Sequence, residues 1–194
     1  MIAIVDKNRM RGLLNWVFDK ILYTAVSYLY VKILLIFREH VVQQVGKIPF
    51  IVIRHRKENR KKCSLRGLEG RSDILFFEYP ACVDLLPNLE QTILLDIDAE
   101  PLSSNDSGPF ILLDGTWRYA SIMKKQIPHL KVCKRRKIPD IWRTAYPRKQ
   151  SEWVDPEQGL ATVEAIYAAS FITNTPMEGI LDYYYWKEDF LEKN

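Results

Sequence analysis

Cysteine and histidine are scarce in this 194-residue sequence, and their scarcity excludes several classes of protein. The three cysteines, Cys63, Cys82 and Cys133, are odd in number and far apart, so they offer neither a disulfide framework nor a CxxC metal knuckle. We therefore expect a reducing, cytoplasmic environment and no bound metal. Three scattered histidines argue against a hydrolytic triad. Dinucleotide-binding, P-loop, HExxH and GxSxG motifs are also absent from the sequence.

No uncharged hydrophobic run is long enough to cross a membrane, although one segment near the N-terminus is very apolar. Leu13–Phe37 is rich in aliphatic and aromatic residues, but lysines on either side leave only Ile21–Val31 uncharged, and a span needs roughly 20 residues. We expect a helix packed on the domain or on a membrane surface, without stable membrane insertion, and no secretory signal is visible. Residues 1–46 are thus predicted to be an apolar helical extension, and residues 47–194 the main domain.

The formal net charge is only +4, so the positions of the charged residues along the chain matter more than the net charge. Seven basic residues and one acid lie between Arg54 and Arg66, directly after an apolar run, and Lys134–Lys137 is a second basic cluster. Such runs form a solvated face or neutralise the phosphates of a nucleic acid. The residues alone leave both interpretations open.

Apolar runs of strand length alternate with segments of helical pattern. The predicted strands are Pro49–Ile53, Asp73–Tyr79, Thr92–Ile97, Phe110–Asp114 and His129–Cys133. The predicted helices are a short one within Pro80–Leu89, then Thr116–Gln126, Leu160–Ile172, and a last one from the capping box Thr175–Glu178 to Phe190. This alternation predicts an α/β fold with a mostly parallel sheet flanked by helices.

Phe110–Ala120 is the stretch with the most pronounced chemistry. An apolar strand ends at Asp114, and a glycine, Thr116 and Trp117 follow. Ligands of open α/β sheets bind at the carboxyl ends of strands, so these residues suit the floor of a small-molecule pocket. A strand followed by a capped helix, with Trp117 in the core, explains the same residues equally well.

Ile138–Gln158 is predicted to be a long loop, because prolines interrupt it throughout. Aromatic residues such as Tyr146 alternate there with Arg143 and Arg148. This mixture suits a surface that contacts unstacked bases and phosphates. Aromatic side chains that fix the loop to the core are the other explanation.

Several motifs resemble those of the aminocarboxypropyl transferase superfamily, which includes DTW-domain proteins and the ribosome-biogenesis transferase acting on small-subunit rRNA. The hallmark Asp-x-Thr-Trp stands here as Asp114–Trp117, with the family's small residue at Ala120. Thr144–Gln150 is similar to the hydroxyl-x-Tyr segment of the family, and Gly159–Ala165 to its Leu-Ser/Thr-x-Glu-Ala helix start. Two further segments resemble the rRNA branch, and they are Lys61–Ser64 and Trp186–Asn194. The resemblance extends from about Lys47 to Asn194.

The resemblance implies a SPOUT-like domain with a C-terminal knot that binds S-adenosylmethionine. It implies transfer of the 3-amino-3-carboxypropyl group to a uridine-type base in RNA, with rRNA favoured and tRNA possible, by a monomer. The zinc-type cysteines of many DTW proteins are absent, which again predicts no metal. A SPOUT-type RNA methyltransferase and a non-catalytic RNA-binding ribosome-assembly factor are the alternatives.

The same resemblance assigns roles to individual residues. Asp114 is the candidate base, or the group that orients the substrate, since an imide N–H must lose its proton. The candidate cofactor-binding residues are Leu95, Thr116, Trp117, Ala120, Tyr146, Leu160 and Thr162. The candidate RNA-binding residues are Arg54, Arg56, Lys61, Lys62, Arg136, Arg143 and Arg148.

Overall fold

A computed structural model describes residues 26, 29, 32, 48–147 and 159–194 of the chain. The chain divides into two compact units, residues 1–41 and residues 42–194. In the first unit, Val26, Leu29 and Lys32 are helical and exposed, and the remainder of the apolar segment Leu13–Phe37 lies outside the described residues. No helix within the described part of the chain is long and apolar enough to span a membrane.

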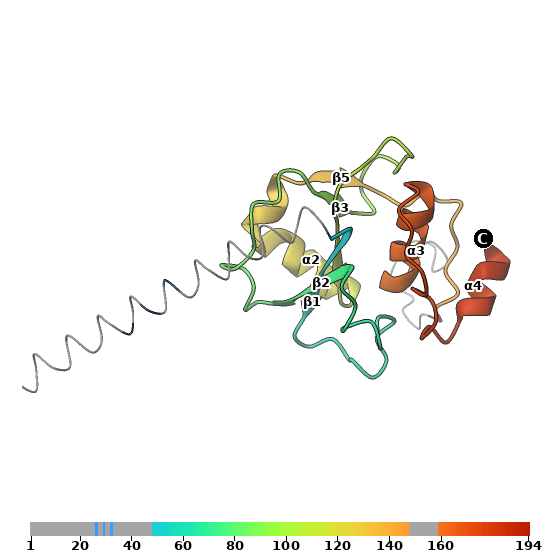
Figure 1. The fold of residues 1–194 in the computed structure, drawn as a ribbon, viewed down its shortest axis with the longest axis horizontal. Coiled ribbons are helices and arrows are strands. Elements are labelled where there is room, and N and C mark those ends of the chain that lie inside the picture. The colour runs from blue at the N-terminus through green and yellow to red at the C-terminus, as the bar shows by residue number, and fades with distance from the viewer. Residues whose placement is uncertain (1–25, 27–28, 30–31, 33–47, 148–158) are drawn as a thin grey trace, which may run out of the picture. The chain divides into compact units, whose positions relative to one another are not determined.

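The second unit is built on a five-stranded sheet in which every strand pair is parallel (Figure 1). The strands in chain order are β1 (Phe50–His55), β2 (Ile74–Tyr79), β3 (Ile93–Leu95), β4 (Phe110–Asp114) and β5 (Lys134–Arg136). Their order across the sheet is β2-β1-β4-β3-β5. The sheet confirms the predicted α/β class and four of the five predicted strands.

Both faces of the central strands are covered, because alternate residues of β1 and β4 enter different parts of the core. Val52 and Leu112 belong to a hydrophobic cluster with residues of α3 (Thr162–Ile172). Ile51, Ile53 and Ile111, which are neighbours along the strands, are fully buried and point to the opposite face, where α2 (Trp117–Gln126) packs against β1 and β4. Strands buried on both faces explain the continuous apolar runs in the sequence.

Helix α3 ends in a Schellman motif in which an asparagine takes the usual place of glycine. Asn174 has a φ of 52°, the left-handed conformation that asparagine tolerates better than most residues. The backbone N–H of Thr175 donates to the carbonyl of Ser170 at 2.8 Å, and that of Asn174 to Phe171 at 3.3 Å. This cap fixes the end of the helix at Ile172.

The predicted helix from Thr175 to Phe190 is wrong over most of its length. Turns occupy residues 178–186, and the helix α4 covers only Lys187–Lys193. Gly179 has a φ of 66°, and a left-handed residue interrupts a right-handed helix. The capping-box pattern at the start of this segment is therefore not followed by a helix.

Two other predicted elements also differ in the structure. Turns rather than a short helix occupy residues 80–85, and no regular element covers residues 86–89, since Pro87 has no N–H to donate and interrupts a helix in this segment. His129–Cys133 is not a strand, because a 3₁₀ helix, η1 (Pro128–Lys131), places Leu130 in the core. The strand of this region is β5, which begins at Lys134 in the basic cluster, directly after the end of the predicted strand.

Candidate functional site

The candidate site lies at a topological switch point of the sheet. Strands β1 and β4 are neighbours, but the chain leaves β1 toward β2 on one side and leaves β4 toward β5 on the other. Connections that diverge from adjacent parallel strands leave a crevice at their carboxyl ends, where ligands of open α/β sheets bind. The predicted pocket floor, at the end of β4, lies at this point.

A cavity of about 290 Å³ opens there, at the lower end of the range of roughly 300–1,000 Å³ for small-molecule sites. Three parts of the chain form it: the connection after β1, the turn from β4 into α2, and the start of α3 with the loop before it. The lining residues are Glu58, Lys62, Cys63, Ser64, Asp114, Gly115, Thr116, Trp117, Tyr146, Pro147, Ala161 and Thr162.

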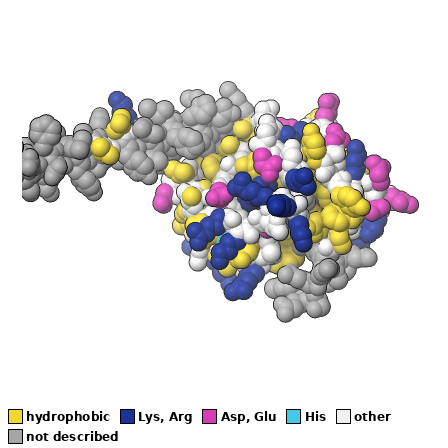
Figure 2. Space-filling model, turned by 90° about the horizontal axis from the view of Figure 1, so that it is seen from below, with side chains coloured by type: hydrophobic (Ala, Val, Ile, Leu, Met, Phe, Trp, Pro, Cys, Tyr) yellow, Lys and Arg dark blue, Asp and Glu magenta, His cyan; other side chains and the backbone are white. Residues whose placement is uncertain are grey.

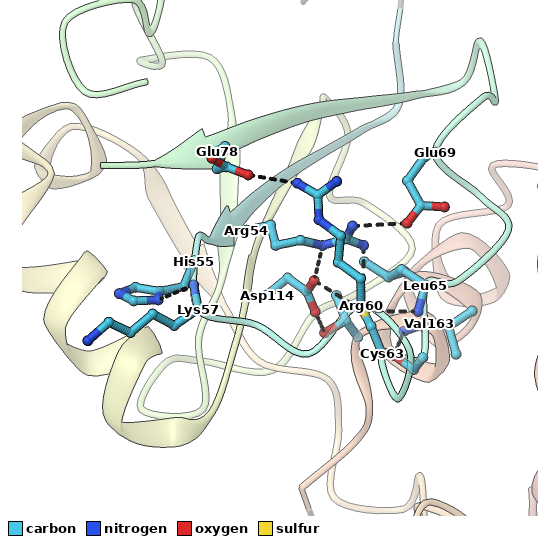
Figure 3. Close-up of polar contacts among 12 residues, drawn as sticks. Arg54, His55, Lys57, Arg60, Cys63, Leu65, Glu69, Glu78, Asp114 and Val163 are labelled. Atoms are coloured by element: carbon cyan, nitrogen blue, oxygen red, sulfur yellow. Dashed lines mark hydrogen bonds and ion pairs between the residues drawn. The ribbon is translucent and has the colours of Figure 1, made fainter. Parts of the chain in front are cut away.

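Asp114 is held at the cavity by a buried ion pair with Arg54. The two residues are direct partners in the β1–β4 register, so their side chains leave neighbouring strands on the same face. The Nε of Arg54 donates to Oδ2 of Asp114 at 2.7 Å, and both side chains are about 5% exposed (Figure 3). Burial alone lowers the pKa of Arg54, but the hydrogen bond and charge of Asp114 raise it above its ordinary value. Arg54 is therefore a permanent cation beside this carboxylate.

Two further donors complete the surroundings of Asp114. The hydroxyl of Thr162, the first residue of α3, donates to Oδ1 at 2.9 Å, and the thiol of Cys63 donates to Oδ2 at 3.4 Å. Burial, and then the charge of Asp114, raise the pKa of Cys63 to about 12, so its thiol stays protonated and does not act as a nucleophile. Asp114 thus joins β1, β4, α3 and the connection after β1.

The turn from β4 into α2 presents Trp117 to the cavity. Thr116 is the N-cap of α2, and its hydroxyl accepts the backbone N–H of Tyr119 at 3.4 Å. Trp117 is half-buried and lines the cavity instead of lying in the core. The sequence left a pocket and a capped helix as alternatives, and the structure contains both a cavity and a helix capped by Thr116.

The start of α3 depends on a buried carboxylate, Glu164. This side chain is fully buried and accepts four hydrogen bonds, from the backbone N–H groups of Ala161 and Ala145 and the hydroxyls of Thr144 and Tyr184. Glu164 therefore fixes the loop before the site, the start of α3 and the segment before α4 to one another.

The connection after β1 and the loop that carries Tyr146 are also joined. The hydroxyl of Ser64 accepts the backbone N–H of Val163 at 3.3 Å and so caps α3 from a distant part of the chain. The hydroxyl of Tyr146 donates to the carbonyl of Lys62 at 3.1 Å, and its ring contacts Trp186 edge to face at 5.0 Å. Three segments far apart in sequence therefore hold the cavity walls in place.

Of the predicted cofactor-binding residues, Thr116, Trp117, Tyr146 and Thr162 line the cavity together with Asp114. Leu95, Ala120 and Leu160 do not line it. Leu95 and Leu160 instead pack against the hydrophobic cluster on the α3 side of the sheet.

The predicted RNA-binding residues differ widely in their exposure. Arg54 is 5% exposed and engaged by Asp114 and Glu69, so the prediction that it contacts RNA does not agree with its burial. Arg136 is paired with the buried Asp106. Arg143 is partly buried, and Arg148 lies outside the described residues. The exposed members of the set are Arg56, Lys61 and Lys62.

Six residues of the cavity wall were not among the predicted site residues, and they are Glu58, Cys63, Ser64, Gly115, Pro147 and Ala161. The signal for Glu58 was its position as the one acid in the basic run. Burial, and then the charge of Asp114, raise the pKa of this side chain. Within the described part of the chain, no group of three or more histidine, cysteine or acidic residues is arranged to hold a metal ion.

Comparison with known proteins gives one structural similarity. The chain is similar to the structure of the SAM-dependent rRNA:acp-transferase Tsr3 from Vulcanisaeta distributa, with a TM-score of 0.54, 21% sequence identity, and coverage of 75% of this chain and 78% of that one. No family model and no curated protein sequence matches the chain. At this level of identity, the similarity establishes a shared fold.

Proposed function

We propose that this protein transfers the 3-amino-3-carboxypropyl group of S-adenosylmethionine to a ring nitrogen of a uridine-type base in RNA, with ribosomal RNA as the favoured substrate. The observation that carries the proposal is the position of the Asp114–Trp117 motif. It stands at the switch point of an all-parallel sheet and shares one cavity with Tyr146 and Thr162. The fold shared with an rRNA:acp-transferase supports the same activity, and a SPOUT-like C-terminal knot is part of the proposal.

The side chains in the cavity fit the chemical groups of S-adenosylmethionine. The cofactor carries a sulfonium and an amino cation, which suit the faces of the aromatic rings of Trp117 and Tyr146. It also carries a carboxylate, which suits Lys62 and the positive ends of α2 and α3, since both helices begin at the cavity. When bound, the cofactor supplies an electrophilic carbon next to sulfur.

The choice between the aminocarboxypropyl group and the methyl group depends on orientation. The carbon that reacts is the one in line with the attacking nitrogen, and such positioning contributes several kcal/mol to a reaction barrier. The rigid cavity walls around Asp114 support a fixed orientation of the cofactor. The target base must leave its stack to reach this cavity.

Calorimetry with S-adenosylmethionine tests the proposal directly. The wild-type protein should bind the cofactor, and Trp117→Ala should abolish the heat of binding because it removes an aromatic wall. Tyr185→Ala is the matched control, since Tyr185 is 87% exposed and does not line the cavity. Absence of binding to the wild type at millimolar cofactor contradicts the enzymatic function.

The reaction product separates the alternatives. Incubation with RNA should release methylthioadenosine, whereas S-adenosylhomocysteine would identify a methyltransferase. RNA binding without either product, unchanged by Asp114→Asn, would identify a non-catalytic assembly factor. Mass spectrometry of RNA nucleosides from a deletion strain should show which RNA class lacks aminocarboxypropyl-uridine.

A further inference from the structure

Among the described residues, two carboxylates line the cavity, Asp114 and Glu58, and their surroundings differ. Asp114 accepts three hydrogen bonds from protein groups, two at Oδ2 and one at Oδ1, and one of the donors is a buried arginine. An ionised carboxylate has about four lone-pair sites. Asp114 therefore has little remaining capacity to accept a proton or hydrogen bond from a substrate.

Glu58 is the carboxylate that remains available to a ligand. It lies in the connection after β1, three residues beyond His55, where a turn fixes the backbone through a 2.8 Å hydrogen bond from the Glu58 N–H to the His55 carbonyl. Its side chain is half-buried, lines the cavity, and forms no ion pair with any described residue. Within the part of the chain that the structure describes, Glu58 is therefore a cavity carboxylate that forms no salt bridge with a lysine or arginine.

The direction of the pKa shift of Glu58 suits a group that accepts a proton from a ligand in the cavity. Burial and the negative charge of Asp114 both raise its pKa, and together they outweigh the opposite effect of Arg54. A general base works best when its pKa approaches the operating pH. Asp114, although held in place by Arg54, thus makes its neighbour more basic.

We propose that Glu58 is the general base of the transfer reaction and that Asp114 is a positioning residue. This inference rests on the proposed function. Glu58 takes the proton from the ring N–H of the acceptor base, and the nitrogen lone pair forms a bond to the carbon next to sulfur. The carbon–sulfur bond breaks, and its electron pair neutralises the sulfonium. The products are the aminocarboxypropylated base, methylthioadenosine and protonated Glu58, which returns its proton to water.

The test compares Glu58→Gln and Glu58→Asp with the wild type, by methylthioadenosine release with saturating cofactor and RNA between pH 6 and 9.5. Glu58→Gln should lower kcat by about 10²-fold or more, the usual contribution of a general base. The rate of Glu58→Gln should rise with pH as the acceptor nitrogen ionises unaided, without the acidic limb of the wild-type profile. Glu58→Asp should retain that limb and part of the rate.

Two measurements without turnover separate a base from a merely structural or cofactor-binding group. Carbon-13 NMR of glutamate-labelled protein, without cofactor, should show one carboxyl that titrates above the ordinary glutamate range and is missing in Glu58→Gln. Calorimetry should give the same cofactor affinity for Glu58→Gln and wild type within about threefold.

Three results would overturn the assignment: a kcat of Glu58→Gln within threefold of wild type, an unchanged acidic limb, or a tenfold loss of cofactor affinity at unchanged kcat. A Glu58 carboxyl that titrates in the ordinary range overturns it as well. An inactive wild type that releases no methylthioadenosine contradicts the proposed function instead, so the two failures are distinguishable.

Discussion

At the scale of single residues, the pair Arg54–Asp114 determines what the site can do. The two charges lie at the last matched position of neighbouring parallel strands, where the end of the sheet meets α3. A buried charge without a partner is unstable, and a buried pair with good geometry avoids this cost. Asp114 therefore organises the cavity as a structural anchor, in addition to any contact with a ligand.

The anchor role predicts a large loss of stability for Asp114→Asn. The substitution leaves Arg54 buried with only the half-exposed Glu69 as a charged partner, and removal of one partner of a buried pair costs about 3 kcal/mol or more. Urea unfolding at pH 7 measures this loss. Glu69→Gln is the matched control and should cost less than about 1 kcal/mol, because that pair is partly exposed. Equal losses for the two variants would show that the Arg54–Asp114 pair is not the anchor.

Asp114 and Trp117 were predicted from the sequence because polar and aromatic groups follow an apolar strand directly, and both line the cavity. Sequence reasoning misassigned Arg54, which reads as the first member of an exposed basic run. Its burial follows from a strand register that pairs positions 60 residues apart, and local sequence does not carry this information. The same holds for Glu164, whose hydrogen-bond donors lie up to 20 residues away on other segments.

At the scale of elements, the apolar strands could be predicted from the sequence, whereas the charged strand β5 could not. β1 and β4 are largely apolar and buried, and β2 is apolar except for the exposed Glu78, so hydrophobic runs predicted these three strands. β5 consists of Lys134–Arg136 at the edge of the sheet, where charged residues are common. Its side chains pair with the buried carboxylates Asp96 and Asp106, which only the folded structure brings near.

Asp106 should give β5 a pH-dependent contribution to stability. Burial alone raises the pKa of Asp106, but hydrogen bonds from Lys134, Ser103 and Arg136 outweigh it and lower the pKa from 3.8 to about 2. The unfolded state then binds protons more readily, so the contribution is complete above the ordinary aspartate pKa and is lost as the pH falls toward 2. Asp106→Asn should lower the free energy of unfolding by about 2 kcal/mol at pH 7.

Urea unfolding of wild type and Asp106→Asn at pH 7, 3 and 2 measures this dependence. The difference between the two proteins should shrink by about half at pH 3 and nearly vanish at pH 2. Asp98→Asn is the control, since Asp98 is largely exposed and its pair with Lys124 is weak. A difference for Asp106→Asn that stays constant from pH 7 to pH 2 would contradict the ionic role of Asp106.

At the scale of the whole molecule, the net charge of +4 conceals two different kinds of basic surface. The three basic residues of β5 pair with two buried carboxylates, Asp96 and Asp106, so part of their positive charge is neutralised. Arg56, Lys61 and Lys62 are exposed on the connection after β1, and Lys62 lines the cavity. Figure 2 shows several lysine and arginine side chains on the face seen from below. RNA phosphates should therefore contact the connection after β1 rather than β5.

The salt dependence of RNA binding tests this distribution. Each phosphate contact adds about 0.7 to the slope of log K against log salt for a single strand. Arg56→Ala with Lys61→Ala should therefore reduce the slope by up to about 1.4. The slope is measured by fluorescence anisotropy with a labelled single-stranded RNA at salt concentrations between about 50 and 300 mM.

The matched control removes the same charge elsewhere. Lys125 and Lys131 are exposed, Lys125 near the C-terminal end of α2 and Lys131 at the end of η1. The helix α2 begins at the cavity, so at 1.5 Å per residue Lys125 lies roughly 12 Å along it from Trp117. Lys125→Ala with Lys131→Ala should leave the slope unchanged, because these lysines lie away from the cavity wall. Equal effects of the two double variants would show that RNA responds to net charge alone, and that the connection after β1 is not its binding surface.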